Sequence, residues 1–312
     1  MIRNNEQIRR VRHTADVIAM VEILSVLISY LIFPILDHIP VFEAGSFGAE
    51  LTDMLLYLAV FAVPIVIASR WTGISFAEMA GKGKPDRTVY LMAIGLTAGW
   101  SYAAGYLGVI VSDGMAWFGV AESAQEYILP TSVWALVVQV IAVALVPPLV
   151  EELCYRGLYL TASVRTMGTW GAIVFTSIAF WLAHQSIEIL PLAVGFGIIG
   201  GYMRRRYQSV LPSMCAHITV NSIYLIANIA EQAGGAQVGA AVSVAISLIE
   251  LLLGAVGITL FLREGGLKTL RTFGYRSSLT AGQMIYAVLT SLPMLTALGI
   301  TIYFTMGNLE VL

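Results

Sequence analysis

The sequence predicts an all-α, polytopic integral membrane helix bundle with eight or nine transmembrane helices and a cytoplasmic N-terminus. First, 58% of the 312 residues are hydrophobic and only 12% are charged, whereas about a quarter of the residues in a soluble domain are charged. Second, the mean hydropathy is +0.82, and the apolar residues gather in runs long enough to cross a bilayer. Third, the lysine and arginine residues lie at the N-terminus and in or near every second connection between these runs.

Nine apolar runs approach the roughly 20 residues that a helix needs to cross a hydrocarbon core ~30 Å thick. In chain order they cover residues 16–36, 50–69, 88–111, 131–163, 170–187, 189–203, 208–230, 237–262 and 283–306. The sixth run is short and rich in glycine, so the expected number is eight or nine. The basic N-terminus resembles that of a signal peptide. However, the first run continues without a small-residue cleavage site, which favours an uncleaved span.

All 17 lysine and arginine residues fall on one side of the nine-span arrangement. Because short cytoplasmic loops are enriched in these residues, the pattern predicts a multi-pass protein of the cell membrane with its N-terminus inside. Membrane lipids are the expected surroundings, and no basic block suggests a nucleic-acid partner. The cysteines, Cys154 and Cys215, lie in apolar runs, which argues against a secreted disulfide framework.

A short set of polar side chains falls within the apolar runs. Its members are Glu22, Gln139, Glu151, Glu152, Arg156, His184, His217, Asn221, Asn228 and Glu250. An ionisable group in the bilayer costs several kcal/mol unless it is partnered, so such residues often mark functional sites. Glu22, near the inner end of the first span, is interpreted as structural and could pair with a loop arginine. Glu250 is expected to make a hydrogen bond in the bundle interior.

The adjacent acids Glu151 and Glu152 should have different surroundings. Glu152 and Arg156 are four residues apart, so they share a helix face in the order that favours an ion pair. Glu151 points about 100° away around the helix and has Tyr155 as its neighbour four residues on. One carboxylate is therefore neutralised and the other free, which is how a site assigns different roles to identical groups.

Three other residues lie on two further runs at a comparable depth. His217 and Asn221 are four residues apart and share a face, and His184 follows Phe180 by four residues on another run. At about 1.5 Å per residue, these side chains and Glu151 lie roughly 13–20 Å from the cytoplasmic helix ends. We expect them to converge in one cavity.

Three motifs occur in order in these runs: EELCYR fits EExxxR, FWLAH fits FxxxH, and HITVN fits HxxxN. Together they resemble the CPBP family of intramembrane metalloproteases. That family includes the type II CAAX prenyl endopeptidases and the Abi-type bacterial proteins linked to bacteriocin processing and immunity. The resemblance covers about residues 130–230. It suggests a division into N-terminal transmembrane helices (1–125), a catalytic helical core (126–232) and C-terminal transmembrane helices (233–312).

The resemblance implies an intramembrane endopeptidase acting on a membrane-associated or lipidated protein or peptide, with the active site reached from the cytoplasmic side. Glu151 would be the general base that activates water, supported by Glu152 and Arg156. His184 would hold the water or a metal, and His217 and Asn221 would stabilise the oxyanion. Tyr155 and Phe180 are supporting residues of the motifs.

A divalent metal such as zinc is an expectation that the spacing leaves open. No HExxH motif is present, but Glu151, His184 and His217 from separate helices could form a catalytic shell with an open position. The sequence also leaves open whether the substrate is prenylated and which oligomer forms.

Two other functions are compatible with buried acids and histidines. A proton-coupled membrane transporter would use them as a proton relay, although no inverted repeat is detectable in the sequence. A catalytically silent membrane scaffold would keep the fold alone, but it has no need for an unpartnered Glu151.

Overall fold

The computed structural model describes residues 2–37, 42–123 and 127–312. Its elements, in chain order, are α1 (Ile2–Asp37), α2 (Phe47–Thr72), α3 (Phe76–Ala80), α4 (Arg87–Trp117), β1 (Val120–Glu122), α5 (Val133–Val140), η1 (Ile141–Leu145), α6 (Val146–Glu151), η2 (Glu152–Tyr159), α7 (Leu160–Ala183), α8 (Leu190–Tyr207), α9 (Leu211–Arg263), α10 (Gly266–Thr272), α11 (Ala281–Leu289), α12 (Leu292–Gly307) and β2 (Leu309–Val311). The segments η1 and η2 are π-helical. The predicted polytopic helix bundle is confirmed.

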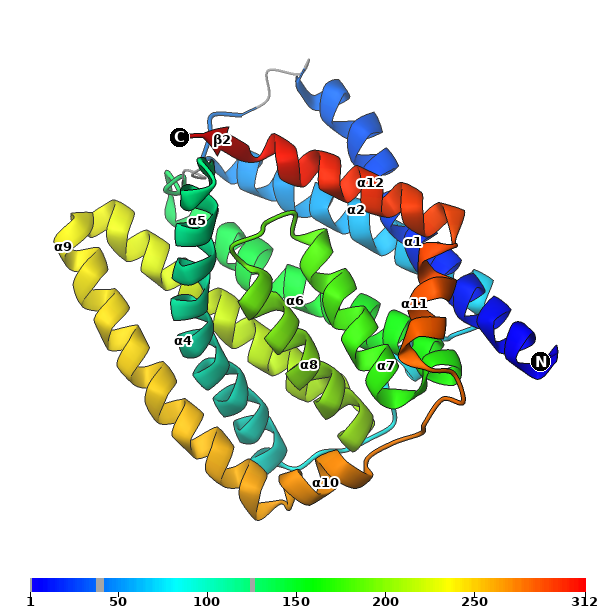
Figure 1. The fold of residues 1–312 in the computed structure, drawn as a ribbon. Helices are drawn as coiled ribbons and strands as arrows, with labels where there is room; N and C mark the ends of the chain where they lie inside the picture. The colour runs from blue at the N-terminus through cyan, green and yellow to red at the C-terminus, as the bar shows by residue number, and fades with distance from the viewer. Residues whose placement is uncertain (1, 38–41, 124–126) are drawn as a thin grey trace.

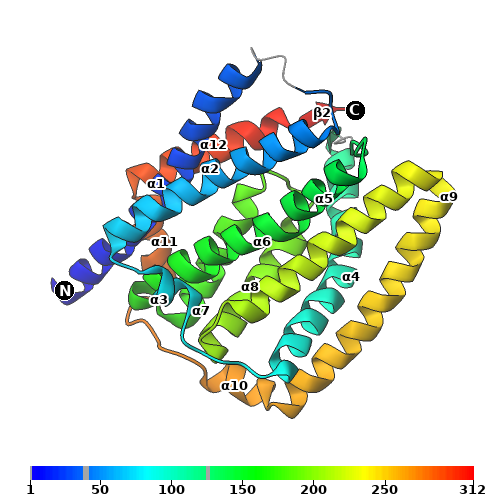
Figure 2. The ribbon, with the colours of Figure 1, turned by 180° about the vertical axis from the view of Figure 1, so that it is seen from behind.

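The helices form a bundle with two flanks and a centre. Helices α1, α2 and α12 lie together on one flank, and α4 with the second half of α9 lies on the other (Figure 1). The view from behind shows the same arrangement, with α6, α7 and α8 between the flanks (Figure 2). The motif-bearing helices are therefore central.

Five helical segments of the described chain are long and apolar enough to cross a membrane, and the bent pair α11 and α12 makes six. Two of the five, Val133–Ala183 and Leu211–Arg263, have 51 and 53 residues. Each of these contains two of the nine predicted runs. The structure thus gives a multi-pass helical protein, and the finer count of eight or nine spans stays a prediction.

Both long segments are interrupted at a glycine. Gly168 in α7 has φ +76° and Gly235 in α9 has φ +77°, a left-handed conformation that only glycine adopts at little cost. Helix α9 changes direction sharply at this break, so its two halves run beside each other like the arms of a V (Figure 1). The breaks explain why one helix can contain two predicted crossings.

Helices α4 and α9 approach each other through glycines. A Cβ atom added at Gly257 would lie 2.3 Å from the backbone nitrogen of Leu96, and one added at Gly99 would lie 2.7 Å from the Cα of Gly254. Small residues at helix–helix contacts in membranes allow this backbone approach. Close backbone packing therefore helps to hold this flank together.

Serine and aspartate side chains begin several helices by accepting a hydrogen bond from a free backbone N–H. Ser75 begins α3 in a capping box with Glu78. Ser75 donates two hydrogen bonds to the Glu78 carboxylate, and both lower the pKa of Glu78. The bond from the backbone N–H has the larger effect, and the bond from the hydroxyl has the smaller one. Ser132 begins α5 just before the motif-bearing segment, so the start of that segment is fixed locally.

One departure from the all-α prediction is a short antiparallel pair formed by β1 and β2, with Val120 opposite Val311 and Glu122 opposite Leu309. Strands of three residues are too short to show a period in the sequence, and their partner is distant along the chain. The pair joins the segment after α4 to residues 309–311.

Candidate active site

Glu151 and Glu152 lie where an α-helical turn changes into a π-helix. Glu151 is the last residue of α6, and Glu152 is the first of η2. Pro147 and Pro148 lie in the first turn of α6, and proline has no N–H to donate to the preceding turn. π-Helical segments are rare and are often found at functional sites, and here two of them flank α6.

The predicted ion pair within the EExxxR motif is confirmed. Arg156 Nη1 lies 2.8 Å from Glu152 Oε1, and the two side chains are only 2% and 0% exposed. The guanidinium carbon lies 4.2 Å from the ring centre of Phe180 and 4.7 Å from that of Phe196. Cation–π contacts and the ion pair together compensate the burial of Arg156.

His217 connects the two carboxylates. Its Nδ1 lies 3.3 Å from Glu152 Oε1, and its Nε2 lies 3.8 Å from Glu151 Oε2. Because Glu152 is paired with Arg156 and can only accept, Nδ1 of His217 is the donor in the first contact. In the neutral ring Nε2 then carries a lone pair, so it and the Glu151 oxygen face each other as two acceptors. A molecule that donates two hydrogen bonds, such as water, suits this gap.

Glu151 has a partner that the sequence did not reveal. The hydroxyl of Tyr57, on α2, donates to Glu151 Oε1 at 2.5 Å. The other oxygen, Oε2, is buried and makes no hydrogen bond to any side chain or backbone group that the structure describes. Tyr57 lies within an apolar run that contains no motif, so only a view of the folded chain brings it to Glu151.

His184 lies at the C-terminal end of α7, next to Phe180. Its Nδ1 is 2.7 Å from the Phe180 carbonyl oxygen, so Nδ1 carries the hydrogen and Nε2 is free to accept in the neutral ring. The Phe180 ring contacts the rings of both histidines, with centres 4.7 Å from His184 and 5.8 Å from His217. No hydrogen bond joins His184 to Glu151 or His217 among the described residues, and its side chain is exposed.

The loop after His184 is held by residues outside the motifs. Gln185 has φ +53°, an uncommon conformation for a residue with a side chain. The carboxylate of Glu122 in β1 accepts bonds from Ser186 Oγ at 2.7 Å and from the backbone nitrogens of residues 187 and 188. Asn308 Nδ2 donates to the Gln185 carbonyl at 3.2 Å. The β1–β2 pair thus fixes the end of the helix that carries His184.

Asn221 contacts the helix backbone next to Glu151. Its Nδ2 donates to the carbonyl oxygen of Val143 in η1 at 3.0 Å. Four residues after Val143 stands Pro147, which cannot make the helical hydrogen bond to that carbonyl. Asn221 therefore satisfies a group that proline leaves unpaired. A carboxamide has a second N–H, which this contact does not use.

Two interpretations of buried residues need correction. Glu22 was interpreted as structural, with snorkelling or a loop arginine as its alternatives, but its Oε1 instead accepts hydrogen bonds from Tyr155 at 3.1 Å and Tyr159 at 2.9 Å. Tyr155 was expected beside Glu151 because of its spacing, but its hydroxyl bonds to Glu22 and its ring contacts Phe180 at 5.1 Å. Both tyrosines lie on η2, and their hydroxyls meet Glu22 on α1.

The three residues proposed as metal ligands do not form a ligand shell as placed. Within the described ranges no group of three or more His, Cys, Asp or Glu side chains could hold a metal ion. His217 and Glu151 are close, whereas His184 contacts Phe180. We derive no step through a metal, and metal binding stays a prediction.

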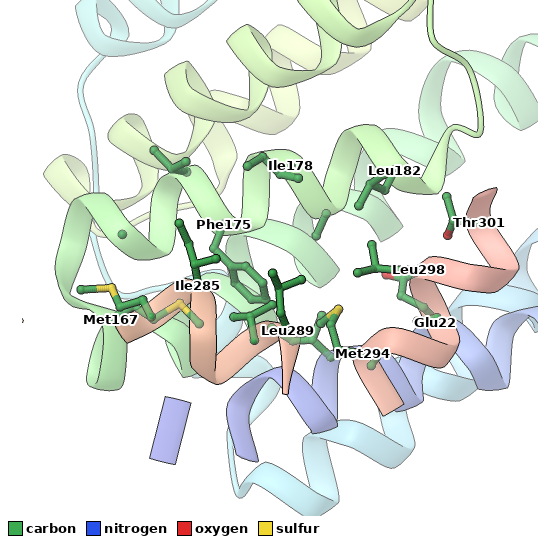
Figure 3. A pocket seen from close by; sticks show the side chains of 18 of the residues that line it. Glu22, Met167, Phe175, Ile178, Leu182, Ile285, Leu289, Met294, Leu298 and Thr301 are labelled. Carbon is green, nitrogen blue, oxygen red and sulfur yellow. The ribbon is translucent and has the colours of Figure 1, made fainter. Parts of the chain in front are cut away.

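An apolar cavity of about 630 Å³ lies beside these residues, within the size range of small-molecule sites. It is lined by residues of α1, α7, α11 and α12, and Glu22 and Met167 lie toward its opposite ends (Figure 3). A second cavity of about 150 Å³ shares Glu22 and also touches Phe61, Ala183 and Gln185, in the range of volumes that can hold several waters. The two cavities meet at Glu22 and extend to the neighbours of His184.

Comparison with known proteins agrees with the motifs. Residues 133–223 match the family described as "Type II CAAX prenyl endopeptidase Rce1-like". The chain is 24% identical over 222 residues to "Putative membrane peptidase YdiL" of Bacillus subtilis (strain 168), which covers 64% of this chain and 86% of that protein. No solved structure matches. The matched range includes every motif residue from Glu151 to Asn221. Residues 133–223 are therefore an Rce1-like type II CAAX prenyl endopeptidase (CPBP) family domain, and the chain is a distant homologue of that membrane peptidase.

Proposed function

We propose that this protein is an intramembrane endopeptidase that hydrolyses a peptide bond of a membrane-associated or lipidated protein or peptide, with Glu151 as the general base. The observation that carries the proposal is the pair of acceptors, Glu151 Oε2 and His217 Nε2, 3.8 Å apart. A general base must lie within about 2.6–3.2 Å of the heavy atom whose proton it removes. A water between these two atoms meets that requirement.

The two carboxylates are assigned different roles by their partners. Glu152 is fully buried and paired with Arg156, so it stays an anion that orients His217 through Nδ1. Glu151 has no cationic side chain at hydrogen-bond distance in the described chain, apart from the longer contact to His217. Glu151 Oε2 faces His217 and makes no hydrogen bond within the described chain, which supports Glu151 as the base.

The reaction proceeds in two steps. Glu151 Oε2 takes a proton from water while the water oxygen attacks the carbonyl carbon of the substrate, and the carbonyl becomes a tetrahedral oxyanion. The proton on Glu151 is then transferred to the amide nitrogen as the C–N bond breaks, which releases an acid and an amine and restores the carboxylate. The proposed role of His184 in holding the attacking water requires the imidazolium form, with Nε2–H donating to the water oxygen, because both hydrogens of that water are directed at Glu151 and His217.

The oxyanion needs hydrogen-bond donors aimed at it. The second N–H of Asn221 can serve, since the first is bonded to Val143. His217 can donate from Nε2 only as the imidazolium, because its Nδ1–H is directed at Glu152. The proposed role of His217 in oxyanion stabilisation therefore requires that the ring gains a proton before or during the attack.

The surroundings of the site support a membrane-embedded substrate. The apolar cavity between α1, α7, α11 and α12 offers space for an apolar part of the substrate next to the helix of His184. The proposed orientation has eight or nine spans, a cytoplasmic N-terminus and access from the cytoplasmic side. The proposed divisions are 1–125, 126–232 and 233–312. The first boundary lies outside the described residues, because residues 124–126 are not described.

The decisive experiment is Glu151→Gln in purified full-length protein, assayed against a panel of membrane-tethered peptides. We expect a loss of cleavage of about 10²–10⁴-fold, the usual contribution of a general base. Glu250→Gln is the matched control, since Glu250 is a buried acid of α9 away from the motifs. Cleavage at the parental rate in Glu151→Gln would show that the assignment is wrong.

Dependence on a divalent metal such as zinc is tested in the same assay. Dialysis against a chelator and readdition of zinc should abolish and restore cleavage if Glu151, His184 and His217 hold the ion. Metal content of the parent and of His184→Ala, measured by mass spectrometry, gives a readout that does not depend on activity.

A further inference from the structure

The tyrosine that contacts the proposed base comes from outside the matched domain. Tyr57 lies on α2, and its hydroxyl donates to Glu151 Oε1 at 2.5 Å. Its ring stacks on that of Phe61 one helical turn later, with centres 4.6 Å apart and planes at 29°. The stack limits the rotation of the phenol, so the hydroxyl is directed toward Glu151 by packing within α2 itself.

The contact decides which oxygen of Glu151 is available for chemistry. A short hydrogen bond from a hydroxyl to a carboxylate is charge-assisted and stronger than one between neutral groups. The terminal torsion of a glutamate is broad and roughly two-fold, so an unrestrained carboxylate would rotate and exchange its two oxygens. Holding Oε1 removes this freedom and leaves Oε2 facing His217 Nε2.

We propose that Tyr57 is a positioning residue for the peptidase reaction, in that its hydroxyl holds Oε1 of Glu151 so that Oε2 accepts the proton of the attacking water. This assignment rests on the proposed function. Tyr57 neither gains nor loses a proton in the reaction. Its effect is geometric, and a misplacement of about 1 Å at a reacting group costs on the order of 10²-fold in rate.

The inference enlarges the active site beyond residues 133–223. Helix α2 precedes the matched segment and contacts α5, η1, α6 and η2, the elements that lead to and contain the two glutamates. Displacing α2 would therefore move Tyr57 away from Glu151 without altering any motif residue. The rate of the proposed reaction then depends on the position of α2 relative to α6.

The experiment compares Tyr57→Phe with the parent in the full chain, on a peptide that the parent cleaves. The substitution keeps the ring that stacks on Phe61 and removes only the hydroxyl. We expect kcat to fall about 10–100-fold while KM stays within about twofold, because orientation of the base is lost and substrate contacts are kept. The control is Tyr102→Phe, which removes a hydroxyl bonded to Tyr106 on α4 at 3.3 Å and should keep the parental kcat.

Thermal unfolding separates positioning from a loss of fold. If Tyr57→Phe is destabilised, Ser69→Ala is measured as well, since it removes the bond from Ser69 Oγ to the Ile74 carbonyl at 2.7 Å at the end of α2 but leaves the Tyr57 hydroxyl and its stack on Phe61 in place. Losses of kcat in both variants in proportion to their losses of stability would overturn the assignment. Loss of kcat in Tyr57→Phe with retention of kcat in an equally destabilised Ser69→Ala would support it.

The failures of the two proposals are distinguishable. A parent that cleaves, a Glu151→Gln variant that does not, and a Tyr57→Phe variant with the parental kcat would overturn the positioning role alone. Parental cleavage by Glu151→Gln would overturn the proposed function and, with it, the role of Tyr57.

Discussion

The segment of residues 133–223 and the helices around it contribute in different ways. The segment contains the motif residues, and it supplies its own buried ion pair, Glu152 with Arg156. The surrounding elements contain no motif, yet they supply the partners of these residues: Tyr57 for Glu151, Glu22 for η2, and Glu122 for the loop after His184. The proposed reacting groups lie in the segment, and elements outside it supply several of their hydrogen-bond partners.

The largest effect is expected inside the segment, for Arg156→Leu. Glu152 would be left as an unpaired buried carboxylate, which typically costs about 3–5 kcal/mol of unfolding free energy. The double variant Glu152→Leu with Arg156→Leu removes both charges and should lose clearly less. Denaturant titration in detergent micelles measures both, and a double variant less stable than Arg156→Leu would contradict this reasoning.

Among the surrounding helices, Glu22→Leu should have the largest effect. It removes the acceptor for two buried hydroxyls, those of Tyr155 and Tyr159, and each unsatisfied group costs about 1–3 kcal/mol. The matched control is Glu22→Gln, which keeps an acceptor oxygen and should retain most of the stability. If the same titration gives Glu22→Leu a loss of stability similar to that of Arg156→Leu, a surrounding helix stabilises the fold about as much as an ion pair inside the segment. Equal stability of the two variants would argue against the role of these hydrogen bonds.

A double-mutant cycle separates the structural role of Asn221 from its proposed catalytic role. Asn221→Ala should cost about 1–3 kcal/mol, because the Val143 carbonyl loses its partner. In a Pro147→Ala background a backbone N–H can reach that carbonyl, so the cost should shrink by about 1 kcal/mol. A cleavage defect that persists in this background would support the oxyanion role, whereas a defect that disappears with the stability loss would remove it.

The smallest effect is expected for Glu122→Gln in β1. One carboxylate oxygen becomes a donor facing other donors, and the loss of charge weakens the remaining bonds, for about 1–2 kcal/mol in all. Cleavage should fall because the loop after His184 loosens. Glu310→Gln, on the paired strand β2 and exposed, is the control. Unchanged cleavage and stability in Glu122→Gln would show that Glu122 does not hold the loop after His184.

Features that depend on residues close to one another in the sequence could be predicted. The apolar runs gave the helical bundle, and the four-residue spacing of Glu152 and Arg156 gave the ion pair, because both depend on geometry within one helix. The family motifs located the segment that the comparison matched. The convergence of Glu151 with His217 is seen in the structure, while His184 is connected to them only through Phe180.

Contacts between distant helices could not be predicted in this way. Tyr57 and Glu22 occupy ordinary positions in apolar runs, and nothing in their own helices marks their partners. Tyr155 bonds to Glu22 on α1 rather than to Glu151, a contact between distant helices that spacing within one helix does not predict. The contact of Asn221 with Val143 could have been suspected from Pro147, which leaves a carbonyl free, but its partner lies on another helix.

The short strand pair also has a consequence for the order of events during synthesis. Strand β1 is made before any of the motif helices, whereas β2 and Asn308 are made after all of them. The hydrogen bond from Asn308 to the Gln185 carbonyl and the β1–β2 pairing can therefore form only once residues 308–311 have emerged from the ribosome. A nascent chain halted before that point would hold every reacting group but would lack this restraint, so hydrolytic competence is expected to come late in biogenesis.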